Sequence, residues 1–360
     1  MRRYQVAAIP GDGIGPEVIP EAIAVLEAVA AADGGFSADV KSLGWGSERY
    51  LETGSLMPDD WAAHLSGFDS ILAGPVGDPR LPDSITVWGL ILTIRQSFGQ
   101  YVNLRPVRLL PGIESALRTT ESDEIDIVFV RENTEGEYSG VGGRVHTGRP
   151  IEVAVESAVF TRTGTERIIR YAFEYARSQG RQKVESVTKS NAQRHSMVFW
   201  DEIFEEVAAE YPDLESGSRL VDAAAAALVT DPGSFDVVVT SNLFGDILTD
   251  LGAAVTGGLG IAPSANLDPA GDRPGLFQAI HGSAPDIAGR GTANPIGEIW
   301  SVALMLRYLG EQAASELLER AMFEALLRPV NHTADLGGSA STADLGLAVR
   351  TALSPAREIS

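Results

Sequence analysis

The sequence predicts an α/β fold in which helices cover a largely buried sheet. Short apolar runs alternate along the chain with longer segments whose apolar residues recur at helical spacing. The chain has 360 residues, more than one hydrophobic core usually holds, which favours two domains or one large α/β unit. It contains no internal repeat and no low-complexity tract.

Five elements are predicted in the first half of the chain. The apolar run at 4–9 indicates a strand, and glycines separate it from a helical stretch at 16–32. Short apolar runs indicate strands at 70–73 and 125–130. Between 164 and 179, apolar residues recur three and four positions apart, which predicts a helix over 164–179.

The second half continues the alternation. A strand at 184–187 precedes a helix at 197–211, and a strand rich in β-branched residues follows at 235–240. Helical periodicity then predicts helices at 298–309 and 311–327. No linker divides the chain into two halves, which suits a discontinuous domain.

The glycines at 11, 13 and 15 follow a strand and open a helix, as in a Rossmann dinucleotide fingerprint. That fingerprint needs G-x-G-x-x-G, and Pro16 stands at the position of the last glycine. A tight turn with Pro16 starting the helix explains the segment better, so the fold is not expected to be a Rossmann fold.

Composition narrows the function. The chain has no cysteine, which excludes disulfides, thiolate catalysis and Cys-type zinc sites. Its formal net charge is −21, which disfavours nucleic acid and anionic membranes as partners. No apolar stretch is long enough for a membrane span and no signal peptide is recognised, so a cytoplasmic enzyme is expected. An anionic substrate would need a local cluster of positive charge.

Three acids are candidates for a cation site. Asp246 and Asp250 would share one helix face, and Asp222 is a further acid in an apolar context. Oxygen-only ligands suit Mg²⁺ or Mn²⁺. By themselves, Asp246 and Asp250 are better explained as a charge cluster at a helix N-terminus.

Other polar residues follow predicted strands. Arg131 and then Tyr138 come after the strand at 125–130, and Lys189 follows the strand at 184–187. Arg95 and Arg105 are further candidates for binding carboxylates, although a surface salt bridge is the better explanation for each alone. A desolvated Lys can act as a base and a Tyr as a proton donor, but loop residues facing solvent fit the spacing equally well.

Together these segments resemble the β-decarboxylating dehydrogenases, the isocitrate/isopropylmalate dehydrogenase family. The motifs are NLRP, RENTEGEYSG, TKSN, SNLFGDILTDL and HGSAPDI, and they span nearly the whole chain. The runs VWGLILTIRQ, YVNLRPVRLLPG and VFTRTGTERIIRYAFEYA are most similar to the tartrate/D-malate dehydrogenase branch. The resemblance implies NAD- and Mg²⁺- or Mn²⁺-dependent oxidation of D-malate or tartrate, usually with decarboxylation, with K⁺ as an optional activator.

The resemblance also implies residue roles. The three arginines would clamp the substrate carboxylates, and Tyr138 would protonate the enolate. Asp246 and Asp250 would hold the metal with Asp222 of the other subunit, which also supplies Lys189 as the base. The active site would therefore require a homodimer.

Cofactor and specificity positions follow in the same way. The residues expected to bind NAD are His281, Gly282, Ser283, Ala284, Pro285, Asp286, Ile287 and Asn294. An acid at 286 would repel a 2′-phosphate, which favours NAD over NADP. The variable group of the substrate would face Trp88, Ile91 and Leu92, with Asn191 and Ala192 of the partner nearby.

The resembled fold has two domains that share a central sheet. The expected cofactor domain combines 1–102 with 256–360, and the substrate and dimerisation domain spans 103–255 with an arm near 140–162. One departure is Gln278-Ala279, where the family usually has Glu-Pro. The alternatives are 3-isopropylmalate, a malate analogue of a specialised pathway hinted at by Gln278, and a non-catalytic regulatory subunit.

Overall fold

The computed structural model describes residues 1–117 and 125–353. Its strands are β1 Arg2–Ile9, β2 Phe36–Ser42, β3 Ser70–Ala73, β4 Val102–Arg108, β5 Asp126–Glu132, β6 Gly136–Val145, β7 Val153–Val159, β8 Lys183–Thr188, β9 Glu215–Leu220, β10 Val237–Thr240, β11 Pro263–Leu267 and β12 Gly275–Ala279. Its longer helices are α1 Gly15–Asp33, α6 Arg162–Ser178, α7 Ser196–Ala208, α8 Val221–Thr230, α9 Asn242–Val255, α10 Ile296–Tyr308, α11 Gln312–Leu326 and α12 Thr342–Leu353. The short ones are α2 Ser47–Thr53, α3 Trp61–Leu65, α4 Asp83–Val87, the π-helix η1 Trp88–Leu92 and α5 Thr93–Ser97.

One ten-stranded sheet runs through the molecule in the order β2-β1-β3-β12-β11-β4-β5-β10-β8-β9. The outer strands pair in parallel on both sides, whereas the central pairs β12–β11, β11–β4 and β4–β5 are antiparallel. A Rossmann sheet is mostly parallel, whereas three consecutive central pairs of this sheet are antiparallel. The predicted α/β fold with a shared central sheet is therefore confirmed, and so is the rejection of a Rossmann fold.

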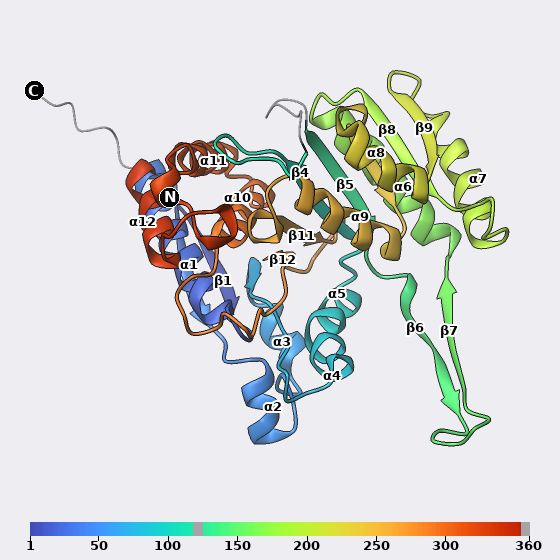
Figure 1. Cartoon of the computed structure of the whole chain (residues 1–360), viewed down its shortest axis with the longest axis horizontal. Helices are drawn as coiled ribbons and strands as arrows, with labels where there is room; N and C mark the ends of the chain where they lie inside the picture. Colours follow the sequence, from blue (N-terminus) through green and yellow to red (C-terminus); the bar gives the residue numbers. More distant parts are fainter. Residues whose placement is uncertain (118–124, 354–360) are drawn as a thin grey trace, which may run out of the picture.

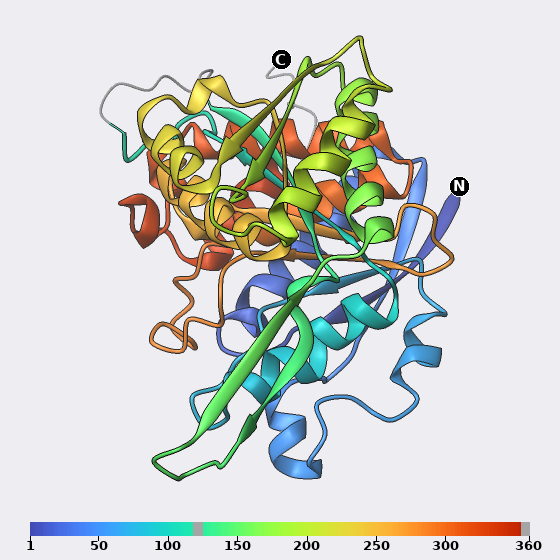
Figure 2. The ribbon, with the colours of Figure 1, turned by 90° about the vertical axis from the view of Figure 1, so that its right-hand side faces the viewer.

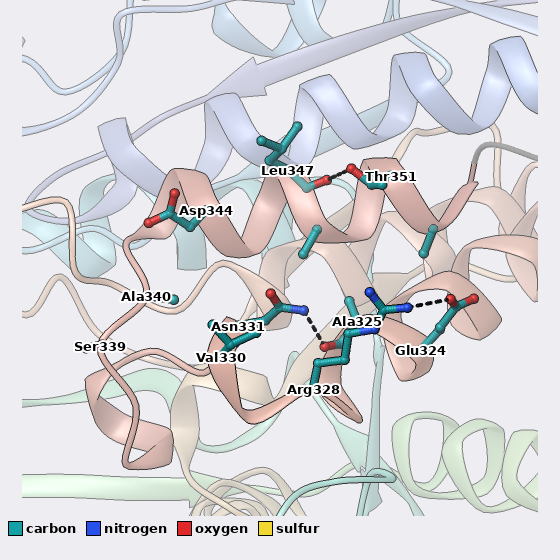
Figure 3. Close-up of a pocket in the computed structure, with 12 residues that line it drawn as sticks. Glu324, Ala325, Arg328, Val330, Asn331, Ser339, Ala340, Asp344, Leu347 and Thr351 are labelled. Carbon is teal, nitrogen blue, oxygen red and sulfur yellow. Dashed lines mark hydrogen bonds and ion pairs between the residues drawn. The ribbon is translucent and has the colours of Figure 1, made fainter. Parts of the chain in front are cut away.

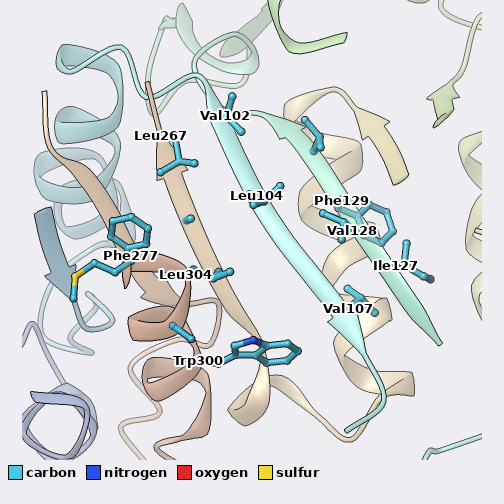
Figure 4. Packing of buried hydrophobic residues seen from close by; sticks show 14 of the residues in the cluster. Val102, Leu104, Val107, Ile127, Val128, Phe129, Leu267, Phe277, Trp300 and Leu304 are labelled. Atoms are coloured by element: carbon cyan, nitrogen blue, oxygen red, sulfur yellow. The ribbon is translucent and has the colours of Figure 1, made fainter. Parts of the chain in front are cut away.

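Helices cover this sheet as the apolar patterns require. Helix α10 packs on β11 and β12, and α6 and α9 both contact β5 (Figure 1). Figure 4 shows Trp300 and Leu304 of α10 in the same buried cluster as Phe277 of β12 and Leu267 of β11, with Val102 on the neighbouring strand β4. Residues 296–306 of α10 are all buried, as expected of a helix that is apolar on every side.

Strands β6 and β7 form a separate two-stranded antiparallel arm that projects from the body of the molecule (Figures 1 and 2). Its strands lie at 136–145 and 153–159, close to the arm expected near 140–162. Its apolar side chains are exposed rather than buried. They are Val141, Val145, Ile151, Val153 and Val155, each about half exposed or more.

The elements predicted from periodicity all exist; β3 has the predicted bounds, and the ends of the others are shifted by up to about three residues. Residues 257–275 are rich in glycine and proline, yet they contain the buried strand β11, because Pro263 is its first residue and the glycines lie outside it. The division into domains at 102/103 and 255/256 stays a prediction. None of the helices in the described residues is both long and apolar enough to cross a membrane.

Candidate active site

A cavity of about 220 Å³ lies between the central strands, the α4–η1–α5 helix and the root of the arm. On the side of the α4–η1–α5 helix its apolar lining includes Val87, Ile91 and Leu92. The polar lining residues are Arg95, Arg105, Arg131, Tyr138, Asp246, Gln278 and His281. Five residues from five separate segments, the three arginines, Tyr138 and Asp246, thus meet where the sequence resemblance expects a substrate.

The three arginines are almost completely buried, at 5%, 5% and 3% exposure. Arg105 donates to Asn103 Oδ1 and to Thr249 Oγ1, both at 2.6 Å. Burial, with the charge of Arg131 beside it, lowers the pKa of Arg95 to about 9, and the same causes lower the pKa of Arg105 to about 9. The Nε of Arg95 is buried without a hydrogen-bond partner. This excess of buried positive charge favours binding of an anion with several carboxylates.

Asp246 is the acid that faces these arginines. Its Oδ1 lies 2.5 Å from Arg131 Nη1 and 3.4 Å from Arg105 Nη2. Burial alone would raise the pKa of Asp246, but Arg131 and Arg105 outweigh it, so the pKa is lowered and the carboxylate stays charged. Helix α9 holds Asp246 in its second turn and not at the helix start. The charge-cluster explanation therefore does not fit Asp246.

Asp250 follows one turn later on α9, and its Oδ1 lies 3.9 Å from Arg105 Nη1. Burial raises the pKa of Asp250. The positive charge of Arg105 opposes this shift, and the negative charge of Asp246 adds to it. A cation between the two carboxylates would relieve this repulsion, and carboxylate oxygens suit a hard divalent ion. Within the described residues of one chain there is no group of three acids or histidines able to hold a metal. The donor set fits Mg²⁺ or Mn²⁺ if further oxygen ligands come from elsewhere.

Tyr138 lies at the root of the arm, in β6. Its hydroxyl donates to Asp246 Oδ2 at 3.1 Å, and the guanidinium of Arg131 lies 5.7 Å from its ring centre. Burial and the nearby Asp246 carboxylate raise the pKa of Tyr138. The side chain is therefore a protonated donor aimed into the cavity.

Lys189 and Asp222 lie together, but not in this cavity. Lys189 Nζ is 2.5 Å from Asp222 Oδ1, and this hydrogen bond lowers the pKa of Asp222. Asn191 and Ala192 follow in the turn after β8 and are exposed. Neither Lys189 nor Asp222 lines the cavity of its own chain, so these four predicted residues form a second, separate group.

The loop after β12 packs on the turn that precedes α1. Ile14 N–H donates to Ser283 O at 2.9 Å, and a Cβ on Gly13 would lie 1.9 Å from that oxygen. Only glycine fits there, so the turn at 11–15 serves close packing, while α1 begins at Gly15. The buried Nε2 of His281 has no hydrogen-bond partner, and Asp286 is exposed. A ligand that lies along this loop would contact the unpaired Nε2 of His281 at the cavity and the carboxylate of Asp286 further along the loop.

Two residues near the cavity lie where the sequence did not predict them. Trp88 does not line the cavity, and its ring lies against Gly140 of the arm instead. Val87 lines the cavity although the sequence did not single it out. The apolar pattern of the sequence does not predict that Val87, and not Trp88, lines the cavity, because this placement depends on the π-helical turn η1.

A larger groove of about 560 Å³ lies between α11 and α12 (Figure 3). Its charged pair, Arg328 and Glu324, lies 3.6 Å apart with both side chains more than half exposed. Among the described residues that line this groove, no buried side-chain nitrogen or oxygen lacks a hydrogen-bond partner. The smaller central cavity is therefore the candidate active site.

Comparisons with known proteins identify the family of the chain. The model of the isocitrate/isopropylmalate dehydrogenase family matches residues 5–349. A probable tartrate dehydrogenase/decarboxylase of Agrobacterium vitis is 49% identical over 353 residues, 98% of each chain. The decarboxylating D-malate dehydrogenase of Escherichia coli K12 is 49% identical and covers 97% of this chain and 98% of its own.

A solved structure gives the same result for the fold. The isocitrate dehydrogenase of Methylococcus capsulatus matches with a TM-score of 0.88 at 38% identity, over 97% of this chain and 99% of that one. The resemblance to the decarboxylating dehydrogenases and their tartrate/D-malate branch is thereby confirmed, as is the expected enzyme class. The chain belongs to the isocitrate/isopropylmalate dehydrogenase family.

Proposed function

We propose that the protein oxidises D-malate or tartrate, with NAD as the hydride acceptor and bound Mg²⁺ or Mn²⁺, in most cases with loss of the β-carboxylate. The observation that carries this proposal is the meeting of Arg95, Arg105 and Arg131 with Tyr138 and Asp246 in one small cavity. Relatives named for tartrate and D-malate, each 49% identical, support the choice of substrate.

Each group has a role in this reaction. The arginines hold the two carboxylates of the substrate, which places its C2 hydroxyl near Asp246. The partner subunit's Lys189 would help to deprotonate the C2 hydroxyl, and Tyr138 returns a proton to the enolate left by CO₂. A divalent ion held by Asp246, Asp250 and the partner's Asp222 would lower the pKa of the alcohol and stabilise the developing negative charge.

The loop at 281–287, with Asn294, would bind NAD. The unpaired Nε2 of His281 offers a hydrogen-bonding group at the cavity end of the loop. The exposed carboxylate of Asp286 can accept from ribose hydroxyls and would repel a 2′-phosphate. Gln278 lines the cavity without a charge. Binding of the nicotinamide end of NAD should therefore depend less on pH than it would with a carboxylate at position 278.

A homodimer is part of the proposal, because Lys189 and Asp222 do not line the cavity of their own chain. The exposed apolar arm β6–β7 supports it, since five half-exposed Val and Ile side chains favour contact with another protein surface. A second copy would cover the arm and bring its Lys189 and Asp222 to the cavity.

The apolar wall formed by Val87, Ile91 and Leu92 favours a second candidate substrate, 3-isopropylmalate, whose alkyl group would contact that wall. A non-catalytic regulatory subunit is disfavoured because Tyr138, Lys189 and both metal acids are present.

The test is NADH formation with Mn²⁺, with and without K⁺, on D-malate, the tartrate isomers, 3-isopropylmalate and isocitrate. Oxidation of D-malate or tartrate that EDTA abolishes and Mn²⁺ restores is the expected result. Activity confined to 3-isopropylmalate would favour the second candidate. Absence of turnover on all four would refute the proposal.

A further inference from the structure

A π-helical turn lies in the wall of the cavity. Helix α4 ends at Val87, the π-helix spans Trp88–Leu92, and α5 continues from Thr93. The Thr93 hydroxyl donates to the Trp88 carbonyl at 2.6 Å, which helps to satisfy an acceptor in the widened turn. Single π-turns inside α-helices are uncommon and often lie at functional sites.

The turn changes which side chains share a face. In an α-helix Trp88 would lie above Leu92, four residues later. In a π-turn the hydrogen bonds span five residues, so the residue above Leu92 is Val87. The cavity lining agrees: Val87, Ile91, Leu92 and Arg95 face it and Trp88 does not.

Trp88 instead contacts the root of the arm. Gly140 has φ +71°, and a Cβ there would lie 3.2 Å from the Trp88 ring. About two turns further on, Gln96 Nε2 donates to the carbonyl of Tyr138 at 3.0 Å. The same helix therefore holds β6 on both sides of Ser139, with Tyr138 between the helix and Asp246.

We propose that the π-turn separates two tasks: Val87 contacts the C3 substituent of the substrate and sets selectivity, whereas Trp88 is a positioning residue that holds Tyr138 through the arm root. The inference rests on the proposed function and names two further residues of that site. A regular helix would give Trp88 the contact with the substrate instead.

Thiol labelling tests the placement without relying on activity. The chain has no cysteine, so Val87→Cys and Trp88→Cys each introduce a single reactive site. Tartrate with Mn²⁺ should slow alkylation of Val87→Cys by iodoacetamide about tenfold and leave Trp88→Cys nearly unchanged. Val330→Cys is the control, because Val330 is 80% exposed and lines the separate groove of Figure 3. Protection of Trp88→Cys but not Val87→Cys would overturn the inference.

Kinetics test the two tasks. Val87→Ala should raise the kcat/KM ratio of 3-isopropylmalate to D-malate about tenfold or more, because two methyl groups leave the wall. Trp88→Leu should lower kcat on every substrate by one common factor while leaving each KM and the ratio between substrates nearly unchanged. Ile85→Ala, outside the cavity lining on the same helix, is the matched control.

The outcomes separate the two proposals. A parent enzyme that oxidises none of the substrates refutes the proposed function. A parent enzyme that is active, with ratios unaltered by Val87→Ala or altered by Trp88→Leu, leaves the function standing and refutes the division of tasks.

Discussion

The hydroxyl of Tyr138 and the guanidinium of Arg131 bind opposite oxygens of the Asp246 carboxylate, at 3.1 and 2.5 Å. Asp246 thus connects the Tyr138 hydroxyl to the buried arginines of the cavity. Its negative charge helps to keep the phenol protonated, and the arginine keeps the carboxylate charged. Changing one member of this trio should alter the reaction more than the fold.

Tyr138→Phe removes the proton donor and retains the ring. We expect kcat on D-malate to fall about 10²- to 10⁴-fold with KM changed little, because the three arginines still bind the substrate. Initial rates of NADH formation measure both constants. A kcat equal to that of the parent would exclude Tyr138 as the proton donor.

Mixing two inactive variants tests the shared site. Tyr138→Phe and Lys189→Ala should each be inactive, yet chains coexpressed in equal amounts should recover about a quarter of the parent activity. Half the dimers would be mixed, and one of the two sites in each would combine an intact Tyr138 with an intact Lys189. If both residues serve the site of their own chain, the mixture should stay inactive.

Asp250→Asn tests the cation site. Loss of one carboxylate ligand should raise the Mn²⁺ concentration for half-maximal activity about tenfold or more, while excess Mn²⁺ restores part of the rate. Asp59→Asn makes the same charge change at an exposed position and is the control. An unchanged Mn²⁺ requirement would remove Asp250 from the set of ligands.

Glu298 provides a prediction about stability. This residue of α10 is fully buried, both carboxyl oxygens lack hydrogen-bond partners, and burial raises its pKa to about 8. Since the ordinary value is 4.5, folding takes up a proton between these two pH values, and the stability contributed by this group falls as the pH rises through that window.

Glu298→Gln removes this titration. The free energy of unfolding should exceed that of the parent by a few kcal/mol at about pH 8, and the difference should narrow towards about pH 5. Urea unfolding at both pH values measures it. A difference that does not change with pH would show that Glu298 does not titrate in this range.

How far the sequence predicts the structure depends on where the apolar residues lie. Helix α6 matches its predicted range closely because Ile168, Ile169 and Phe173 are spaced along one buried stripe. The strands of the arm gave no such signal, since β6 is rich in glycine and faces solvent, and only the family resemblance placed an arm there.

The candidate site, like the fold, was predicted from the sequence only in part. Sheet pairing brings Arg105 and Arg131 together, because β4 and β5 are antiparallel neighbours, and no spacing along the chain reveals that pairing. Motif resemblance predicted the cluster instead. It placed Trp88 in the cavity, however, because resemblance carries over residue types and positions but not the hydrogen-bond register of a helix.

The π-turn also affects how relatives should be compared. A π-turn arises when one residue is inserted into an α-helix without changing the helix at either end. A relative with a regular helix here would have one residue fewer between the positions of Pro82 and Arg95. An alignment without that gap would equate Trp88 with a residue that faces the substrate, and would transfer specificity to the wrong side chain.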